Sequence, residues 1–270
     1  METIEQRKAR ERQEDLQRLK KLRPIDDDFM RCLFKDNIPL TQHLLRVLTK
    51  NSDIIVKSVK TQADMKRLVG ARSICLDAYG TDSKGNKYDI EVQRADKGAC
   101  VRRARYHSSV MDVENLDAGQ DFDELPETYT IFITENDIYN KGLASYPFER
   151  VNMEIGELFN DGEHIIYVNG SYRGNDELGK MMHDFSCSNP DEIINKDLAE
   201  QMRYYKESEK GVEAVCKLME DMKNQKAQET RLDDIQKMMT KLKLTVEQAM
   251  DVLDIPPSER MSYLERIDAR

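Results

Sequence analysis

The stretch from Arg72 to Gln93, RSICLDAYGTDSKGNKYDIEVQ, is the part of the sequence that decides the fold. Apolar and polar residues alternate from Arg72 to Tyr79 and again from Lys87 to Gln93, which is the period-two pattern of strands. The residues between them, 80–86, are rich in Gly, Asp, Ser and Asn, which favour turns. The pattern predicts an antiparallel β-hairpin with its turn centred on Lys84.

Acidic residues occupy matching positions on the two predicted strands. Asp77 precedes Lys84 by as many residues as Glu91 follows it, so the two acids face each other if the turn is centred there. Asp89 and Gln93 share their face by period-two geometry. Like charges directly opposite each other destabilise a sheet, and a Mg²⁺ or Mn²⁺ ion held by Asp77 and Glu91 would offset the repulsion. The opposite face is apolar and comprises Ile74, Leu76, Ile90 and Val92.

Two interpretations of the acidic face remain open from the spacing. In the first, it is the solvent-exposed polar face of an ordinary hairpin. In the second, it is a metal site, where the cation polarises a phosphoryl oxygen and lowers the pKa of a water that attacks phosphorus. A buried arginine that locks either carboxylate into the interior would argue against the metal site.

The remaining sequence predicts an α/β core with a helical C-terminal extension. Residues 1–23 are expected to form a flexible or helical arm, 24–190 the core domain, and 191–270 the extension. The predicted core order is helix, three strands, helix, strand. The elements that give this order are helices near 29–34, 40–48 and 97–116 and strands near 54–59, 72–79, 87–93, 128–134 and 164–169.

Composition narrows the class of protein. Hydrophobic residues make up 39% of the 270 residues, which is enough for a core and excludes a wholly disordered chain. No apolar run is long enough to cross a bilayer, and no signal sequence follows the charged N-terminus. The five cysteines are odd in number and form no CxxC pair, which fits a reducing cytosol. We expect a soluble, cytoplasmic protein without a membrane partner.

The net charge of −9 argues against nucleic-acid binding in general, but the charge is unevenly distributed. Basic residues gather between positions 94 and 110, where Asp96 is the single acid. A local basic face can hold a phosphate backbone, and a solvated helix surface is the alternative. The basic residues are Arg94, Lys97, Arg102, Arg103 and Arg105.

Three segments resemble the PD-(D/E)XK nuclease family transposases, the recombination-promoting nuclease group. They are LDAY at 76–79, YDIEVQ at 88–93 and RRARY at 102–106, and the acidic start of the first helix at 25–34 gives weaker support. The resemblance implies a restriction-endonuclease-like core of order α-β-β-β-α-β. It also implies a Mg²⁺-dependent DNA endonuclease associated with a mobile element or with recombination.

The resemblance also suggests residue roles. Asp77 and Glu91 would bind the metal, and Gln93 stands where the family name has lysine. Because an amide carries no charge and is no base near neutral pH, Gln93 is expected to orient the attacking water or to ligate the metal. The DNA phosphates would be bound by Arg102, Arg103, Arg105 and Tyr106, and these arginines would supply the missing charge. Asp26 and Asp27 are the expected auxiliary acids, with helix capping as their alternative role.

Two further hypotheses concern the C-terminal helices. The protein is alternatively a weak or inactive nuclease relative that binds nucleic acid or proteins through these helices. The helices between Asp197 and Lys243 are also long enough to pair in a homodimer, although they carry no sustained heptad pattern.

Overall fold

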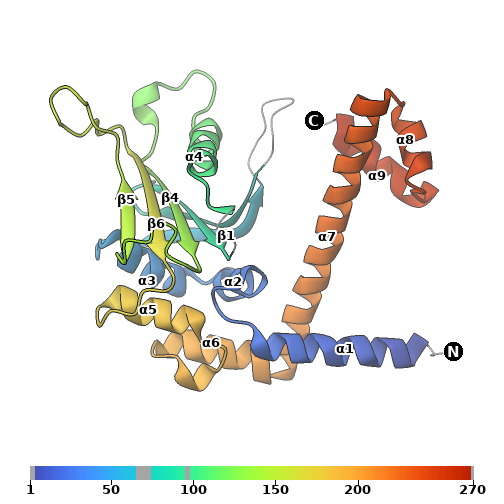
Figure 1. Cartoon of the computed structure of the whole chain (residues 1–270), viewed down its shortest axis with the longest axis horizontal. Coiled ribbons are helices and arrows are strands. Elements are labelled where there is room, and N and C mark those ends of the chain that lie inside the picture. Colours follow the sequence, from blue (N-terminus) through green and yellow to red (C-terminus); the bar gives the residue numbers. More distant parts are fainter. Residues whose placement is uncertain (1–3, 65–73, 95–97, 269–270) are drawn as a thin grey trace. The chain divides into compact units, whose positions relative to one another are not determined.

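The computed structural model describes residues 4–64, 74–94 and 98–268 (Figure 1). The described residues form two compact units, one that runs to Cys216 and one that begins at Lys217. The helices between residue 191 and Cys216 therefore belong with the sheet-containing unit, while the sequence analysis assigned them to the C-terminal extension.

The first unit contains a six-stranded mixed sheet of order β1-β2-β3-β4-β6-β5. The β1–β2, β2–β3 and β5–β6 pairs are antiparallel, and β3–β4 and β4–β6 are parallel. Parallel neighbours need a crossover connection, which α4 provides between β3 and β4. The strands are β1 (Val56–Asp64), β2 (Cys75–Asp82), β3 (Lys87–Gln93), β4 (Thr128–Thr134), β5 (Ser145–Phe148) and β6 (Glu163–Asn169).

Helices cover both faces of the sheet, with α4 on one side and α3 and α5 on the other (Figure 1). Gly80 lies on the face next to α3, where an added Cβ atom would be 3.8 Å from Leu45. The helices of this unit are α1 (Ile4–Lys21), α2 (Asp27–Phe34), α3 (Ile38–Thr49), α4 (Val101–Asn115), α5 (Glu177–Ser186), α6 (Lys196–Glu207) and the start of α7 (Glu209–Leu242), with short 3₁₀ turns η2 (Phe122–Glu124) and η3 (Pro190–Glu192).

The turn between β2 and β3 fixes the register that places the acidic residues. The Asp82 carboxylate accepts the backbone N–H groups of Lys84 and Asn86 at 2.9 and 3.0 Å, and Gly85 takes a left-handed φ of 92°. The paired residues Ala78 and Ile90 lie symmetrically about position 84. The predicted hairpin and its register are confirmed.

The N-terminal arm, expected to be flexible or helical, contains the helix α1, and Leu19 near its end is buried in the first unit. Other predicted elements differ from the structure. The first strand begins at Val56, two residues later than expected, and β5 was not predicted. Residues 72 and 73 of the expected second strand and residue 97 of the helix expected near 97–116 lie outside the described residues.

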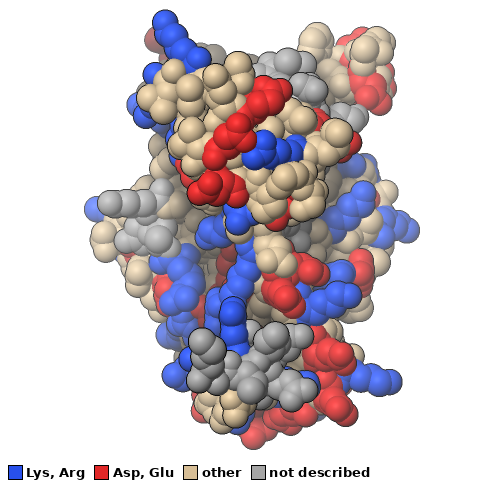
Figure 2. Space-filling model, turned by 90° about the vertical axis from the view of Figure 1, so that its right-hand side faces the viewer, with Lys and Arg blue, Asp and Glu red and all other residues tan. Residues whose placement is uncertain are grey.

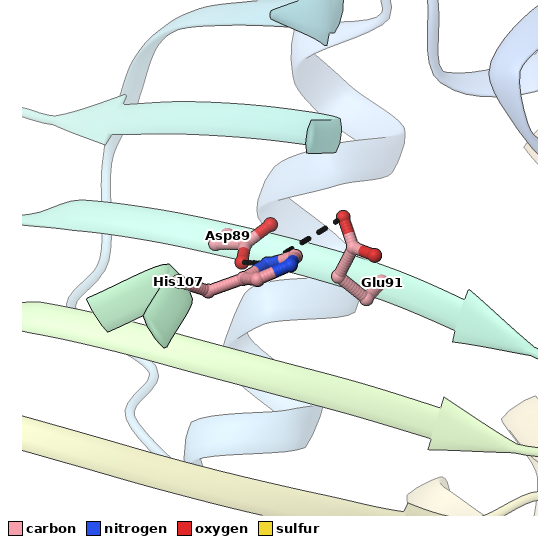
Figure 3. A group of neighbouring side chains, drawn as sticks. All are labelled: Asp89, Glu91 and His107. Atoms are coloured by element: carbon pink, nitrogen blue, oxygen red, sulfur yellow. Dashed lines mark hydrogen bonds and ion pairs between the residues drawn. The ribbon is translucent and has the colours of Figure 1, made fainter. Parts of the chain in front are cut away.

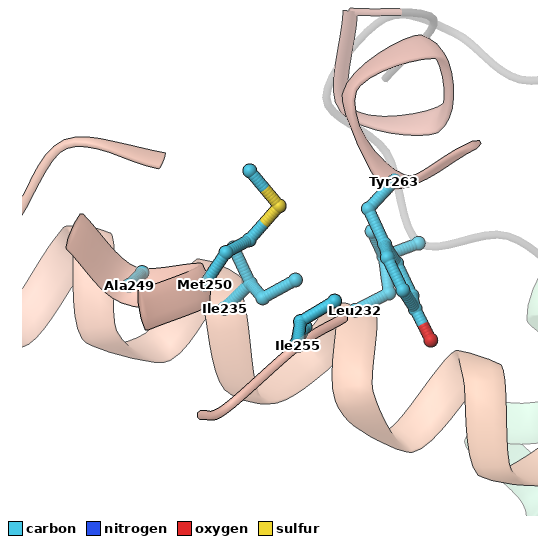
Figure 4. Close-up of a cluster of buried hydrophobic side chains, with 6 residues drawn as sticks. All are labelled: Leu232, Ile235, Ala249, Met250, Ile255 and Tyr263. Carbon is cyan, nitrogen blue, oxygen red and sulfur yellow. The ribbon is translucent and has the colours of Figure 1, made fainter. Parts of the chain in front are cut away.

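The second unit is helical and has its own core. The end of α7 packs with α8 (Val246–Val252) and α9 (Pro257–Asp268), and a capping box between Thr245 and Gln248 begins α8. The described parts of these helices bury a common apolar core. Its buried residues are Leu232, Ile235, Ala249, Met250, Ile255 and Tyr263 (Figure 4).

Among the helices that the structure describes, none combines the length and the apolar character needed to cross a bilayer. Cys32, Cys100, Cys187 and Cys216 are free thiols.

Candidate active site

The hairpin brings Asp77 and Glu91 together in the interior. The Asp77 backbone N–H donates to Glu91 Oε1 at 3.0 Å, and Asp77 Oδ2 accepts the Val92 N–H at 3.2 Å. Asp77 is 4% exposed and Glu91 is fully buried. The interpretation of this face as solvent-exposed is wrong, because β3 is an inner strand whose acidic face is covered by α4.

Each of these carboxylates has an arginine partner. Arg31 of α2 lies 2.6 Å from Asp77 Oδ1, and Arg103 of α4 lies 2.6 Å from Glu91 Oε2. The Arg31 side chain is 16% exposed and that of Arg103 is 36% exposed. Neither arginine is fully buried, so neither is the locking contact that would argue against a metal site, although both guanidinium groups compete with a cation for these carboxylates.

A second buried pair, Asp89 and His107, lies beside Glu91 (Figure 3). His107 Nδ1 is 2.8 Å from Asp89 Oδ2 and 4.0 Å from Glu91 Oε1. These three side chains offer ligand atoms within 4.8 Å of one another, which is close enough to hold a metal ion. Sequence reasoning missed His107, although its four-residue spacing from Arg103 and the alternation along β3 were available as signals.

The auxiliary acids predicted on the first helix have different surroundings. Asp27 Oδ1 lies 2.9 Å from Arg31 Nε, so Asp27 and Asp77 share one guanidinium. Burial, and then the nearby Asp77 carboxylate, raise the pKa of Asp27 to about 7. Asp26 instead closes a ring of four ion pairs whose distances run from 2.8 to 3.3 Å and whose members are Arg23, Asp26, Arg94 and Glu135.

Negative charge is in excess in this cluster. Among the described residues, the acids Asp27, Asp77, Asp89 and Glu91 form ion pairs with two guanidinium groups, those of Arg31 and Arg103. Burial raises the pKa of Asp89 and of Glu91 well above the usual range, and neighbouring carboxylates raise both further. One oxygen of Asp89 has no hydrogen-bond partner among the described residues. Hard divalent cations prefer oxygen donors of this kind, so the residues present fit a Mg²⁺ or Mn²⁺ ion.

Gln93 ends β3 beside this cluster and is half-buried. Its side-chain oxygen packs against Gly98, where a Cβ atom would overlap it. Its backbone carbonyl accepts the Glu135 N–H at 3.2 Å, which ties it to the end of β4. The absence of a side chain at Gly98 therefore leaves the space that the amide oxygen occupies.

The residues predicted to bind phosphate separate on α4. Arg103 turns inward to Glu91, Arg102 and Arg105 are exposed, and Tyr106 is half-buried. On the face shown in Figure 2, Lys and Arg side chains are interspersed with Asp and Glu. The structure thus brings Arg103 into the acidic cluster and leaves Arg102 and Arg105 on the surface.

The model of one protein family, the PD-(D/E)XK nuclease family transposases, matches residues 33–249, which is well over half of the chain. The match includes the hairpin and α4 but begins after Asp26 and Asp27. No curated protein matches the chain, and no solved structure matches it.

Proposed function

Because the chain belongs to the PD-(D/E)XK nuclease family transposases, we propose that it is a metal-dependent DNA endonuclease that hydrolyses phosphodiester bonds. The proposal includes a restriction-endonuclease-like core, Mg²⁺ or Mn²⁺ as the cofactor, and a setting in recombination or a mobile element. The mixed α/β architecture of the first unit is consistent with such a core.

The observation that carries the proposal is the pairing of Asp77 and Glu91 under α4 within an excess of buried acid. Buried carboxylates without enough positive charge destabilise a fold, and clusters of this kind gather at functional sites. A divalent cation held by Asp77 and Glu91 would compensate the charge, polarise a phosphoryl oxygen of the DNA and lower the pKa of a bound water.

The chain's own residues take separate roles in this proposal. Asp77 and Glu91 hold the cation, and Gln93, held against Gly98, orients the attacking water through its amide. Asp27 acts as the auxiliary acid because it and Asp77 pair with the same Arg31 guanidinium. The charge of Asp26 is instead neutralised by two other arginines, Arg23 and Arg94. The exposed residues of α4 contact DNA phosphates, with Arg102, Arg105 and Tyr106 as the contacts.

Metal-dependent nicking of supercoiled plasmid DNA tests the proposal. Nicking is expected with Mg²⁺ or Mn²⁺ and is expected to disappear in Asp77→Ala and in Glu91→Ala. Asp28→Ala is the matched control, because Asp28 lies on the same helix as Asp27 but pairs with Arg18 and not with Arg31. Nicking that survives both carboxylate changes would contradict the proposal.

A second candidate function is favoured by the two ion pairs. If Arg31 and Arg103 stay on Asp77 and Glu91 when Mn²⁺ is supplied, the protein is an inactive nuclease relative that binds nucleic acid or proteins. The absence of nicking with every divalent metal tested would support this candidate.

Location and assembly stay predictions. A cytoplasmic location is expected from the cysteine pattern, and fractionation of cells tests it. A homodimer formed through the C-terminal helices is tested by sedimentation of the full chain.

A further inference from the structure

We propose that Asp89 and His107 are positioning residues that hold Arg103 against Glu91, and that Arg103 supplies the positive charge that Gln93 lacks. The inference rests on the proposed function, because it assigns the missing cation of that same site. It separates Arg103 from Arg102 and Arg105, which are exposed on α4.

Arg103 is fixed by three acceptors in different directions. Its Nη2 donates to Glu91 Oε2 at 2.6 Å, its Nε to His107 Nε2 at 3.1 Å, and its Nη1 to the Gly98 carbonyl at 3.2 Å. The guanidinium carbon also lies 5.8 Å from the centre of the Phe132 ring, within cation–π range. A side chain held in this way loses little further freedom when it binds a ligand.

The hydrogen-bond chemistry determines the state of His107. A guanidinium N–H only donates, so His107 Nε2 must accept, and the ring proton must sit on Nδ1. That proton is donated to Asp89 Oδ2 at 2.8 Å. Asp89 therefore sets the tautomer of His107 that accepts from Arg103.

The same contacts argue against His107 as a metal ligand. Both ring nitrogens already have partners, and His107 is 1% exposed. A cation bound by Asp89, Glu91 and His107 would have to break the bond to Asp89 or the bond to Arg103. We therefore assign Asp89 and His107 to the support of Arg103 and leave the cation to Asp77 and Glu91.

Arg103 and Gln93 both contact Gly98. The Gly98 carbonyl accepts a hydrogen bond from Arg103. Because Gly98 has no side chain, the Gln93 amide can pack against it. The described contacts use three of the five N–H donors of Arg103, which leaves two for a phosphate oxygen. Arg103 thus has the charge, the position and the donors to act on a phosphate beside Gln93.

Steady-state kinetics of plasmid nicking tests the positioning role. His107→Leu is expected to lower kcat by about 10- to 100-fold, the usual effect of losing such a supporting contact, with KM for DNA unchanged. The decrease in kcat is expected to be smaller in Asp89→Asn than in Asp89→Leu, because the asparagine amide oxygen can still accept the hydrogen bond from His107 Nδ1. The glutamine oxygen in His107→Gln can accept a hydrogen bond from Arg103, so kcat is expected to decrease less in this variant than in His107→Leu. His107→Gln also replaces His107→Leu in the test if the leucine variant fails to fold. His164→Gln is the matched control, since His164 pairs with Glu149.

Two spectroscopic measurements decide the inference without DNA cleavage. The NMR signal of the Arg103 Nε–H is expected to be protected from exchange and to lose that protection in His107→Leu. The pulsed EPR spectrum of bound Mn²⁺ is expected to show no coupling to a histidine nitrogen.

Nitrogen coupling that disappears in His107→Leu or His107→Gln would overturn the inference, because His107 would then be a ligand. An Arg103 signal unchanged in both His107 variants would also overturn it. If the wild type does not nick DNA but both spectroscopic expectations are met, the proposed function fails and the assignment of Asp89 and His107 to Arg103 stands.

Discussion

Replacing Arg31 with alanine is expected to destabilise the metal-free protein and to tighten its binding of Mn²⁺. Arg31 is the guanidinium nearest to Asp77, and it also pairs with Asp27. The variant therefore leaves two neighbouring carboxylates without their shared partner. A cation bound between Asp77 and Glu91 would replace part of the positive charge that the variant has lost.

The size of both effects follows from the burial of the pair. Removing one partner of a buried ion pair costs about 3–5 kcal/mol, and because Arg31 keeps some exposure we expect about 3 kcal/mol. Two unit charges 4 Å apart interact by about 4 kcal/mol in a partly buried site, so a guanidinium there strongly opposes a divalent cation. Solvent screening reduces this effect, and we expect Mn²⁺ to bind at least about tenfold more tightly, or about 1.4 kcal/mol.

Isothermal titration with Mn²⁺ and thermal unfolding with EDTA or Mn²⁺ measure the two effects. Mn²⁺ should raise the melting temperature of Arg31→Ala more than that of the wild type, since a ligand that binds only the folded state stabilises it. Arg18→Ala is the matched control, because Arg18 forms an exposed pair with Asp28 and should cost less than about 1 kcal/mol. Mn²⁺ binding that stays equal or weakens in Arg31→Ala would refute the claim that the cation takes the place of Arg31 on Asp77.

Three other changes test separate parts of the structure. In EDTA, the raised pKa of Asp27, about 7, lets the folded state keep a proton that the unfolded state releases near pH 4. The free energy of unfolding, measured with urea, should therefore decrease from pH 4 to pH 7. The decrease should be smaller in Asp27→Asn, and an equal dependence on pH in the variant and the wild type would contradict this. Gly98→Ala should displace the Gln93 amide and slow nicking by up to about 100-fold with little change in stability, and an unchanged rate would argue against a role for Gln93. Ile235→Ala should weaken the C-terminal core by about 2–5 kcal/mol in calorimetry and leave nicking unchanged, whereas lost nicking would favour the C-terminal helices as the working surface.

The local pattern of the sequence was sufficient to predict the hairpin. Alternation and turn chemistry around Lys84 predicted the ends of β3 and the pairing of β2 with β3. Strand β4 was predicted with the same bounds, because its β-branched and aromatic residues are bounded by polar ones. Strand β5 was not predicted, because its four residues include Pro147 and are too few to show an alternation of apolar and polar side chains.

The surroundings of the acids were not predictable in the same way. Alternation shows which residues share a face of a strand, but it does not show which element covers that face. The sequence left open whether Asp89 and Glu91 face solvent, and only the crossing of α4 shows that they are buried. The pairing of Arg31 with Asp77 joins residues 46 positions apart, and no local pattern reports such a contact.

Net charge was a poor guide to the site for the same reason. The value of −9 describes the whole chain, while the cluster depends on a few side chains brought together by the hairpin, α2 and α4. Arg103 illustrates the point, because the sequence grouped it with Arg102 and Arg105 and the structure turns it toward Glu91.

The most direct test is a crystal structure of the protein soaked in Mn²⁺, with the anomalous signal recorded. We expect one anomalous peak between the carboxylates of Asp77 and Glu91, with the Arg31 guanidinium moved off Asp77 and Arg103 still bonded to His107. A peak coordinated by His107, or carboxylates that keep both arginines under saturating Mn²⁺, would contradict the account.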